Sequence, residues 1–262
     1  MARLRLDGRR LQVRHDLEVT EVRIGGIVTK PWIPIVVFVA TVAVIAVTVA
    51  ILFPIAALDT FSRYAVMAEA FAAGNWKEAF HPRFGVGFPV LSGLLCRLTG
   101  MDGYRCCTAV STLVWALGLI PLFRLTRRIF GETAAWFAVI LYAFCPQTLI
   151  WGLKGFRDSF RVAGILFFAS GVVARRFDPR SGLVEAMVGF ALLTLFRGDA
   201  VLQAAVLALV FAGVDGFRLK TALLAGWSIL ALQPSCWLVW SWTGSWVPVY
   251  EGVWILRRLF GG

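Results

Sequence analysis

The feature that most constrains this chain is an apolar run, residues 33–57, that contains no charged side chain. About 20 apolar residues in a helix are enough to cross the hydrocarbon core of a bilayer. Inside that core every backbone polar group needs a partner within the segment, so the run is expected to be helical. The 262-residue chain is 59% hydrophobic and only 16% charged, which is more apolar than a soluble domain of this length. We therefore expect an integral membrane protein.

Further apolar runs predict an all-α protein with about seven transmembrane helices. After residues 33–57, the runs lie at about 105–124, 132–151, 159–174, 182–196, 199–214 and 220–243. Three of them are short for a crossing, and only Arg197-Gly198-Asp199 separates the fifth predicted helix from the sixth. Charge at that depth requires surrounding protein or a water-filled cavity.

The predicted organisation has a basic cytoplasmic segment (1–32), a transmembrane module (33–243) with a long outer loop (58–104), and an interfacial amphipathic tail (244–262). Seven Lys and Arg residues precede residue 32, and cytoplasmic segments are enriched in these residues. This distribution places the N-terminus inside and the long loop outside a bacterial-type cytoplasmic (inner) membrane. The net charge of +11 indicates contact with membrane lipids, not nucleic acid, because no basic stretch is interleaved with stacking aromatics.

The five cysteines and two histidines do not follow a metal-binding pattern. No Cys/His set has the spacing of metal ligands, so no cofactor is predicted, although a divalent metal near His81 stays open. A disulfide between Cys96 and Cys106 is an alternative to free thiols. The eleven tryptophans are interpreted as an aromatic belt at the membrane interface.

The outer loop holds the most informative residues. Apolar positions recur at helical spacing between Phe61 and Ala72, which predicts an amphipathic helix that stops at Gly74-Asn75. Residues 86–99 predict a second, apolar helix. Asp59 is the first polar side chain after the first membrane helix. It is either an N-cap or a base that takes a proton from an acceptor hydroxyl at the lipid interface.

The order of short motifs in this loop resembles a known family. Asp59 is followed by Arg63-Tyr64-Ala65, Gly74-Asn75-Trp76, His81-Pro82 and Phe88-Pro89. This order is similar to the first outer loop of the GT-C glycosyltransferases of glycosyltransferase family 39, which includes protein O-mannosyltransferases and the aminoarabinose transferases of lipid A. The likeness continues through Arg105 to Pro146 and to Arg197, and it covers the core seven-helix module only.

The resemblance implies a membrane enzyme that takes a sugar from a polyprenyl-phosphate donor and transfers it to an acceptor on the outer face. By position in the family pattern, the catalytic acids correspond to Asp59 and Asp158. The residues that bind the substrates correspond to Arg63, His81, Lys154, Arg157 and Arg197. Arginine suits this role because its guanidinium binds phosphate oxygens in a bidentate manner.

Two departures from the family favour an alternative function. Several members carry two adjacent acids where this chain has Asp59-Thr60, and full-length relatives add further membrane helices and a soluble outer domain. The alternative is a non-catalytic membrane subunit, derived from the same fold, that packs against a protein partner in a larger complex. A transporter is disfavoured because the sequence has no convincing internal repeat.

The assignment of Asp59 predicts the behaviour of one variant. Asp59→Asn is expected to abolish sugar transfer without loss of folding, because the amide cannot take a proton from the acceptor. Transfer by the purified variant in detergent is the measurement, with its unfolding temperature as the control for folding. Normal transfer by this variant would rule out the proposed role of Asp59.

Overall fold

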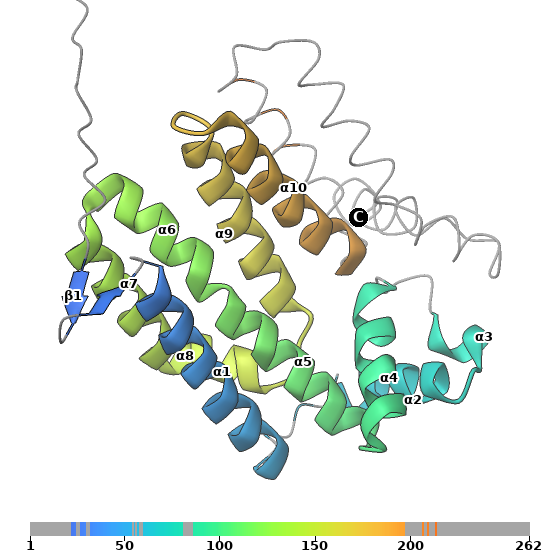
Figure 1. Ribbon diagram of the computed structural model, residues 1–262. Helices are drawn as coiled ribbons and strands as arrows, with labels where there is room; N and C mark the ends of the chain where they lie inside the picture. The colour runs from blue at the N-terminus through green and yellow to red at the C-terminus, as the bar shows by residue number, and fades with distance from the viewer. Residues whose placement is uncertain are drawn as a thin grey trace, which may run out of the picture.

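The computed structural model describes residues 22–24, 27–29, 32–53, 55, 57, 60–80 and 86–196, together with positions 206, 209 and 213. This part of the chain is mostly helical (Figure 1). Ahead of the first helix, β1 (Val22–Ile24) and β2 (Ile27–Thr29) pair in an antiparallel hairpin. The hairpin was not predicted, although β-branched residues on both sides of a Gly-Gly pair are a recognisable hairpin pattern.

Two helices of the described chain are long and apolar enough to cross a membrane. One is α1 (Ile33–Leu52), with 20 residues, and the other is a continuous 28-residue helix made of α5 (Gly103–Leu117) and α6 (Leu119–Phe130). A third candidate is α7 (Glu132–Phe144) followed by α8 (Pro146–Leu153), which are bent by 57° relative to each other. The bend occurs at Pro146, whose nitrogen has no hydrogen to continue the helical ladder.

These helices confirm that the chain contains membrane-crossing candidates, while the number seven stays a prediction. The run expected at 33–57 forms a helix only as far as Leu52. The membrane helices predicted at 199–214 and 220–243, the charged turn between Arg197 and Asp199, and the tail lie outside the continuously described residues.

Two further helices form a hairpin, α9 (Asp158–Ala174) and α10 (Pro179–Phe196), close to the predicted bounds. Glycines let their backbones approach each other. A Cβ on Gly171 would lie 2.4 Å from the backbone nitrogen of Ala186, and a Cβ on Gly182 would lie 2.4 Å from that of Arg175. Small residues at the seam between two helices permit such close packing.

A buried ionic cluster joins this hairpin to α6. Glu185 on α10 is 7% exposed. Its Oε1 accepts a hydrogen bond from Arg124 at 2.8 Å, and its Oε2 accepts from Arg128 at 3.2 Å and from the Ser170 hydroxyl at 2.7 Å. Arg128 also donates to the Ser170 carbonyl at 3.1 Å. A buried carboxylate requires partners of this kind, so the cluster fixes α6, α9 and α10 relative to one another.

The outer loop forms a compact layer against α5. It contains a π-helical segment (Thr60–Ala65), α2 (Val66–Ala72), α3 (Trp76–Ala79) and α4 (Gly87–Thr99). Both helices predicted for this loop are confirmed.

A carboxylate attaches this layer to the bundle. Glu69 on α2 accepts a hydrogen bond from the Gly103 backbone nitrogen at 2.8 Å. Asp102 accepts another from the backbone nitrogen of Arg105 at 2.9 Å. Carboxylates stabilise the N-terminus of α5 because the first N–H groups of a helix lack partners within it.

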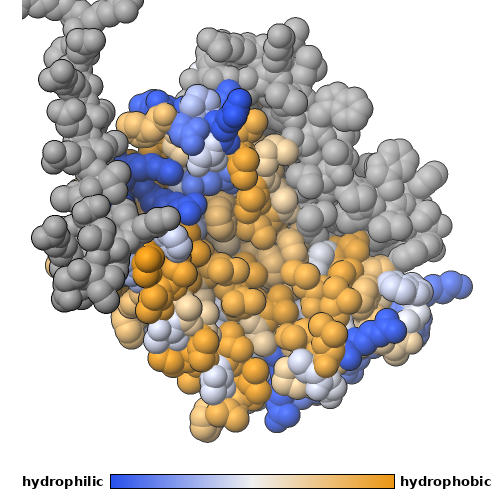
Figure 2. Space-filling model, in the orientation of Figure 1, coloured by the Kyte–Doolittle hydropathy of each residue, from blue (hydrophilic) through white to orange (hydrophobic). Residues whose placement is uncertain are grey.

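Apolar side chains cover much of the bundle's surface. Figure 2 shows a broad hydrophobic area, with hydrophilic residues gathered above it around the α9–α10 turn and below it around the outer loop. Large apolar side chains of α1 and α7 are exposed, among them Val37, Ile45, Phe137 and Leu141. A soluble monomer rarely exposes such a continuous apolar surface, whereas a helix that faces lipid does.

The ionic cluster predicts a specific loss of stability. Glu185→Gln is expected to lower the free energy of unfolding by about 2–3 kcal/mol, because it leaves two arginines without their buried partner. Glu132→Gln is the control: its pair with Arg127 is on the surface, with side chains 47% and 38% exposed, and should contribute less than about 1 kcal/mol. Thermal unfolding of both variants tests this, and equal effects would show that the cluster does not hold the helices together.

Candidate functional site

The site is built around the turn between α8 and α9, which hydroxyl groups hold in place. The hydroxyl of Thr60 donates to the Lys154 carbonyl at 2.8 Å. The hydroxyl of Ser111 on α5 donates to the Phe156 carbonyl at 2.8 Å. The turn is therefore attached both to the beginning of the outer loop and to the long helix, and it presents the first turn of α9 in a fixed position.

A glycine makes the close approach of Thr60 possible. Gly155 has a φ of +71°, a left-handed conformation that L side chains rarely adopt. A Cβ at this position would lie 2.9 Å from the Thr60 methyl carbon. Any larger residue would be strained and would push the outer loop away from the turn.

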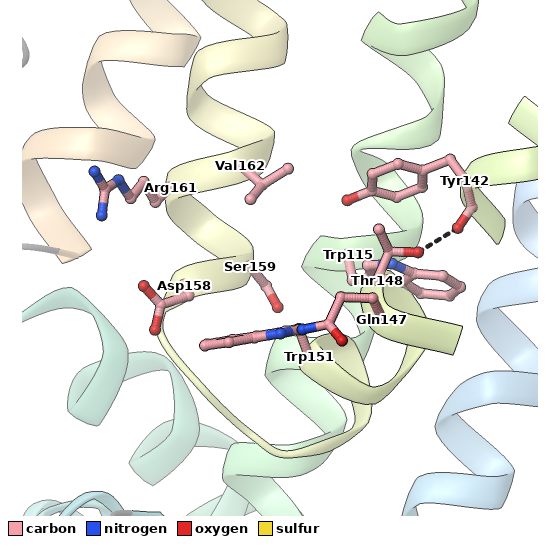
Figure 3. Close-up of a pocket in the computed structure, with 9 residues that line it drawn as sticks. All are labelled: Trp115, Tyr142, Gln147, Thr148, Trp151, Asp158, Ser159, Arg161 and Val162. Atoms are coloured by element: carbon pink, nitrogen blue, oxygen red, sulfur yellow. Dashed lines mark hydrogen bonds between the residues drawn. The ribbon is translucent and has the colours of Figure 1, made fainter. Parts of the chain in front are cut away.

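A cavity of about 340 Å³ lies beside this turn. Its volume falls in the range of about 300–1,000 Å³ that is typical of ligand pockets. Side chains from four helices line it (Figure 3): Trp115, Tyr142, Gln147, Thr148, Trp151, Asp158, Ser159, Arg161 and Val162. The bend between α7 and α8 contributes to its shape, because Tyr142 precedes the bend and Gln147, Thr148 and Trp151 follow it.

The cavity has a charged side. Asp158 and Arg161 project from the same side of α9, one turn apart, and both are half-buried (Figure 3). Among the residues that the structure describes, no hydrogen bond or ion pair involves Arg161. A half-buried guanidinium in an apolar bundle is costly without an anion. Figure 3 shows both side chains on the side of α9 that faces away from Trp115 and Tyr142, so the charged groups border the cavity, and this border is suited to a carboxylate or phosphate group.

The opposite side of the cavity is aromatic. Ser159 and Val162 face toward Trp115 and Tyr142 across the cavity (Figure 3). The rings of Trp115 and Tyr142 are stacked, with centroids 6.1 Å apart and planes at 19°. Together with the amide of Gln147, these rings provide apolar faces beside hydrogen-bonding groups, which is an arrangement suited to a sugar ring.

Only one of the predicted site residues that the structure describes lines the cavity. Asp158 lines the cavity. Arg157 lies instead with its guanidinium carbon 5.9 Å from the centroid of the Tyr64 ring, within the range of a cation–π contact. Lys154 is half-buried on the turn, and Arg63 is exposed on the π-helical segment. Asp59, His81 and Arg197 lie outside the described residues.

Described neighbours of two of those residues lie near the start of α9. Thr60, which follows Asp59 in the sequence, contacts the α8–α9 turn. Phe196, which precedes Arg197, stacks on Phe160 with ring centroids 3.8 Å apart. The beginning of the outer loop, the start of α9 and the end of α10 therefore meet at one end of the bundle.

The cavity also contains residues that were not predicted. Arg161 had a signal in the sequence, since it is a charge within an apolar helix, one turn after Asp158. The remaining lining residues had none: they are ordinary apolar or polar positions that become a site only when four helices pack together.

Comparisons with protein-family models, with curated proteins and with solved structures found no match. Within the described ranges, no three His, Cys, Asp or Glu side chains are grouped so that they could hold a metal ion. The geometry of the cavity and its surroundings therefore carries the functional argument.

The attachment of the turn predicts the effect of a nearly isosteric change. Thr60→Val is expected to lower the free energy of unfolding by about 1–2 kcal/mol, because a buried carbonyl loses its donor. Thr41→Val on α1 is the matched control, since that hydroxyl is exposed and bonds only within its own helix. Thermal unfolding in detergent compares the two, and an unchanged Thr60→Val variant would show that this hydrogen bond does not hold the turn.

Proposed function

We propose that this protein is a membrane glycosyltransferase that moves a sugar from a polyprenyl-phosphate donor to an acceptor on the outer face of the membrane. One observation carries the proposal. The residue after Asp59 contacts the turn that leads into Asp158, and the residue before Arg197 contacts the first turn of α9. Beside them lies a cavity lined by Asp158 and by Arg161, which has no hydrogen bond or ion pair among the described residues. The sequence resemblance requires these three segments, which are far apart in the sequence, to lie close together in the fold.

The position of several arginines at the end of the bundle away from the cavity supports the proposed orientation. The 17-residue helix α9 begins at Asp158 and ends beside Arg175, so these two residues are separated by about 25 Å. Near the Arg175 end lie Arg124 and Arg128, held by Glu185. Arginines concentrate on the cytoplasmic side of membrane proteins. The cavity then lies toward the outer side, where a flipped lipid-linked donor is available.

The proposed chemistry assigns a role to each charged group. A hydroxyl oxygen of the acceptor forms a bond to the anomeric carbon of the sugar, and the bond from that carbon to the phosphate oxygen breaks. The proton of the hydroxyl passes to a carboxylate, Asp59 or Asp158. The electron pair leaves with the polyprenyl phosphate, whose charge Arg161 stabilises together with the cations predicted from sequence.

The first experiment measures transfer by the whole chain in lipid nanodiscs. Undecaprenyl-phosphate sugars of several kinds are the donors, and release of undecaprenyl phosphate is followed. Asp158→Asn is expected to reduce turnover at least about 100-fold, in line with the loss of an acid–base group.

Asp178→Asn is the matched control for that experiment, because it changes the same functional group at the opposite end of α9. Asp178 caps α10 by accepting from the Arg180 nitrogen at 3.0 Å, and Asn performs this role equally well. Equal turnover by the Asp158 and Asp178 variants would rule out the role of Asp158. If no donor binds while the chain co-purifies with a membrane partner, the non-catalytic subunit is the better description.

The second experiment concerns Arg161. Arg161→Gln is expected to raise the KM for the donor about 10- to 100-fold, which corresponds to the loss of a charge-assisted hydrogen bond to phosphate. Arg176→Gln is the control, since that arginine is exposed on the α9–α10 turn. An unchanged KM for the Arg161 variant would exclude phosphate binding on this side of the cavity.

A further inference from the structure

Two arginines of α6 share a single buried carboxylate. Arg124 and Arg128 both donate to Glu185, at 2.8 and 3.2 Å. Arg128 also donates to the backbone carbonyl and to the hydroxyl of Ser170. Two guanidinium groups carry two positive charges, whereas one carboxylate carries one negative charge. The trio of Arg124, Arg128 and Glu185 therefore keeps one uncompensated positive charge.

Both guanidinium groups of the trio retain donors for a further acceptor. Each arginine bonds through Nη1 alone, and in the described ranges neither has another hydrogen bond or ion pair. A guanidinium has five N–H donors in a planar fork, so the Nε and Nη2 groups are still available. The side chains of Arg124 and Arg128 are 48% and 26% exposed. An anion from outside the bundle can therefore reach the pair, which Glu185 already holds in position.

Further arginines surround the trio at the same end of the bundle. Residues 124–132 and 175–185 contain six arginines but only three acids. Arg175 lies close to the trio, because a Cβ on Gly182, one helical turn before Glu185, would lie 2.4 Å from the Arg175 backbone nitrogen. A surface with this excess of positive charge attracts anions and repels cations.

Exposed apolar side chains lie beside these cations. Ile129 and Phe130 directly follow Arg128 and are 52% and 74% exposed, and Phe177 on the α9–α10 turn is 56% exposed. Figure 2 shows the hydrophilic residues around this turn directly above the broad hydrophobic area. Arg124 precedes the end of α6 at Phe130 by six residues, or about 9 Å. Cations near a helix end and above an apolar surface are typical of the level at which lipid headgroups lie.

The chemistry of this surface selects an anionic phospholipid. A phosphodiester brings one negative charge, which balances the charge of the trio, and its oxygens match the forks of the two guanidinium groups. The acyl chains of the same molecule would cover the adjacent apolar surface. A choline headgroup adds a cation that the surrounding arginines repel, whereas the glycerol headgroup of phosphatidylglycerol adds none.

We propose that Arg124 and Arg128 form a binding site for the headgroup phosphate of an anionic phospholipid, and that Glu185 is the positioning residue of this site. The site lies at the end of α9 opposite Asp158. The inference therefore goes beyond the proposed function and does not depend on it.

The test measures lipid binding by the full chain in detergent. Native mass spectrometry gives the dissociation constants of dioleoyl-phosphatidylglycerol and dioleoyl-phosphatidylcholine, which share their acyl chains and their phosphate. The wild-type chain is expected to bind phosphatidylglycerol about five- to tenfold more tightly. Arg124→Gln leaves Glu185 with Arg128 and Ser170, which balances the charge of the carboxylate, and this variant should lose most of the preference.

Arg127→Gln is the matched control, because it removes the same charge three residues away. Arg127 forms a one-to-one pair with Glu132, so it leaves no excess charge for a phosphate. This variant should keep the preference for phosphatidylglycerol. If the Arg124 and Arg127 variants lose it equally, the lipid responds only to overall charge and the inference is wrong. It is also wrong if the wild-type chain binds both lipids equally well.

A second variant covers the case in which Arg124→Gln does not fold. Arg124→Lys keeps an ion pair with Glu185 but removes the planar fork. It should bind phosphatidylglycerol about three- to tenfold more weakly than the wild type, with an unchanged unfolding temperature in the absence of lipid. Wild-type affinity in this variant would overturn the proposal.

Excess inorganic phosphate separates a lipid site from a site for a soluble anion. It should not displace phosphatidylglycerol from the wild-type chain, because it lacks acyl chains to cover the apolar surface. Displacement by inorganic phosphate would show that the arginines bind a soluble anion, and the assignment to a phospholipid would be wrong.

Discussion

The arrangement of the bundle depends on one buried carboxylate. Glu185 accepts hydrogen bonds from two arginines of α6 and from Ser170 of α9, and it is itself part of α10. A charge in this position is tolerated only when its partners are present, so the cluster strongly favours a single arrangement of the three helices. Because α9 begins at Asp158, this arrangement also decides where the charged side of the cavity lies.

Hydroxyl and aromatic contacts hold much of the opposite end of the bundle. Hydroxyl groups attach the α8–α9 turn to α5 and to the outer loop. A series of aromatic contacts runs from Tyr64 through Phe88 and Phe160 to Phe196. These contacts connect the outer loop, α9 and α10, and they leave the cavity between a fixed turn and a bent helix. The site therefore lies on rigid elements, which is a requirement for precise ligand positioning.

The sequence predicted the helices better than it predicted their contacts. Apolar runs and the stop signal at Gly74 are local, so the helices of the outer loop and most of the long helix through α5 and α6, predicted at about 105–124, were recognisable. The 57° bend was not, since Pro146 gave only a boundary and the angle follows from packing. Arg124 and Arg128 lie at or just beyond the end of a predicted membrane helix, which by itself indicates only cytoplasmic cations. Their partner Glu185 is about 60 positions away in the sequence, and no local pattern connects them.

The residues of the candidate site also divide into those that the sequence identified and those that it did not. Asp158 was identified only by its position in the family pattern that the sequence resembles. Trp115 was not, because the tryptophans were interpreted as an interfacial belt, and its place in the wall of a cavity exists only in three dimensions. Nothing in a linear pattern separates a tryptophan in a membrane belt from one in the wall of a cavity.

The glycine seam between α9 and α10 has a consequence for how the protein enters a membrane. An ionised carboxylate raises the free energy of inserting a helix into lipid. Gly171 and Gly182 bring α10 so close to α9 that Ser170 already hydrogen-bonds to Glu185 within the hairpin. In the seven-helix arrangement predicted from the sequence, these two helices would enter lipid as a pair, with the acid already hidden from the acyl chains.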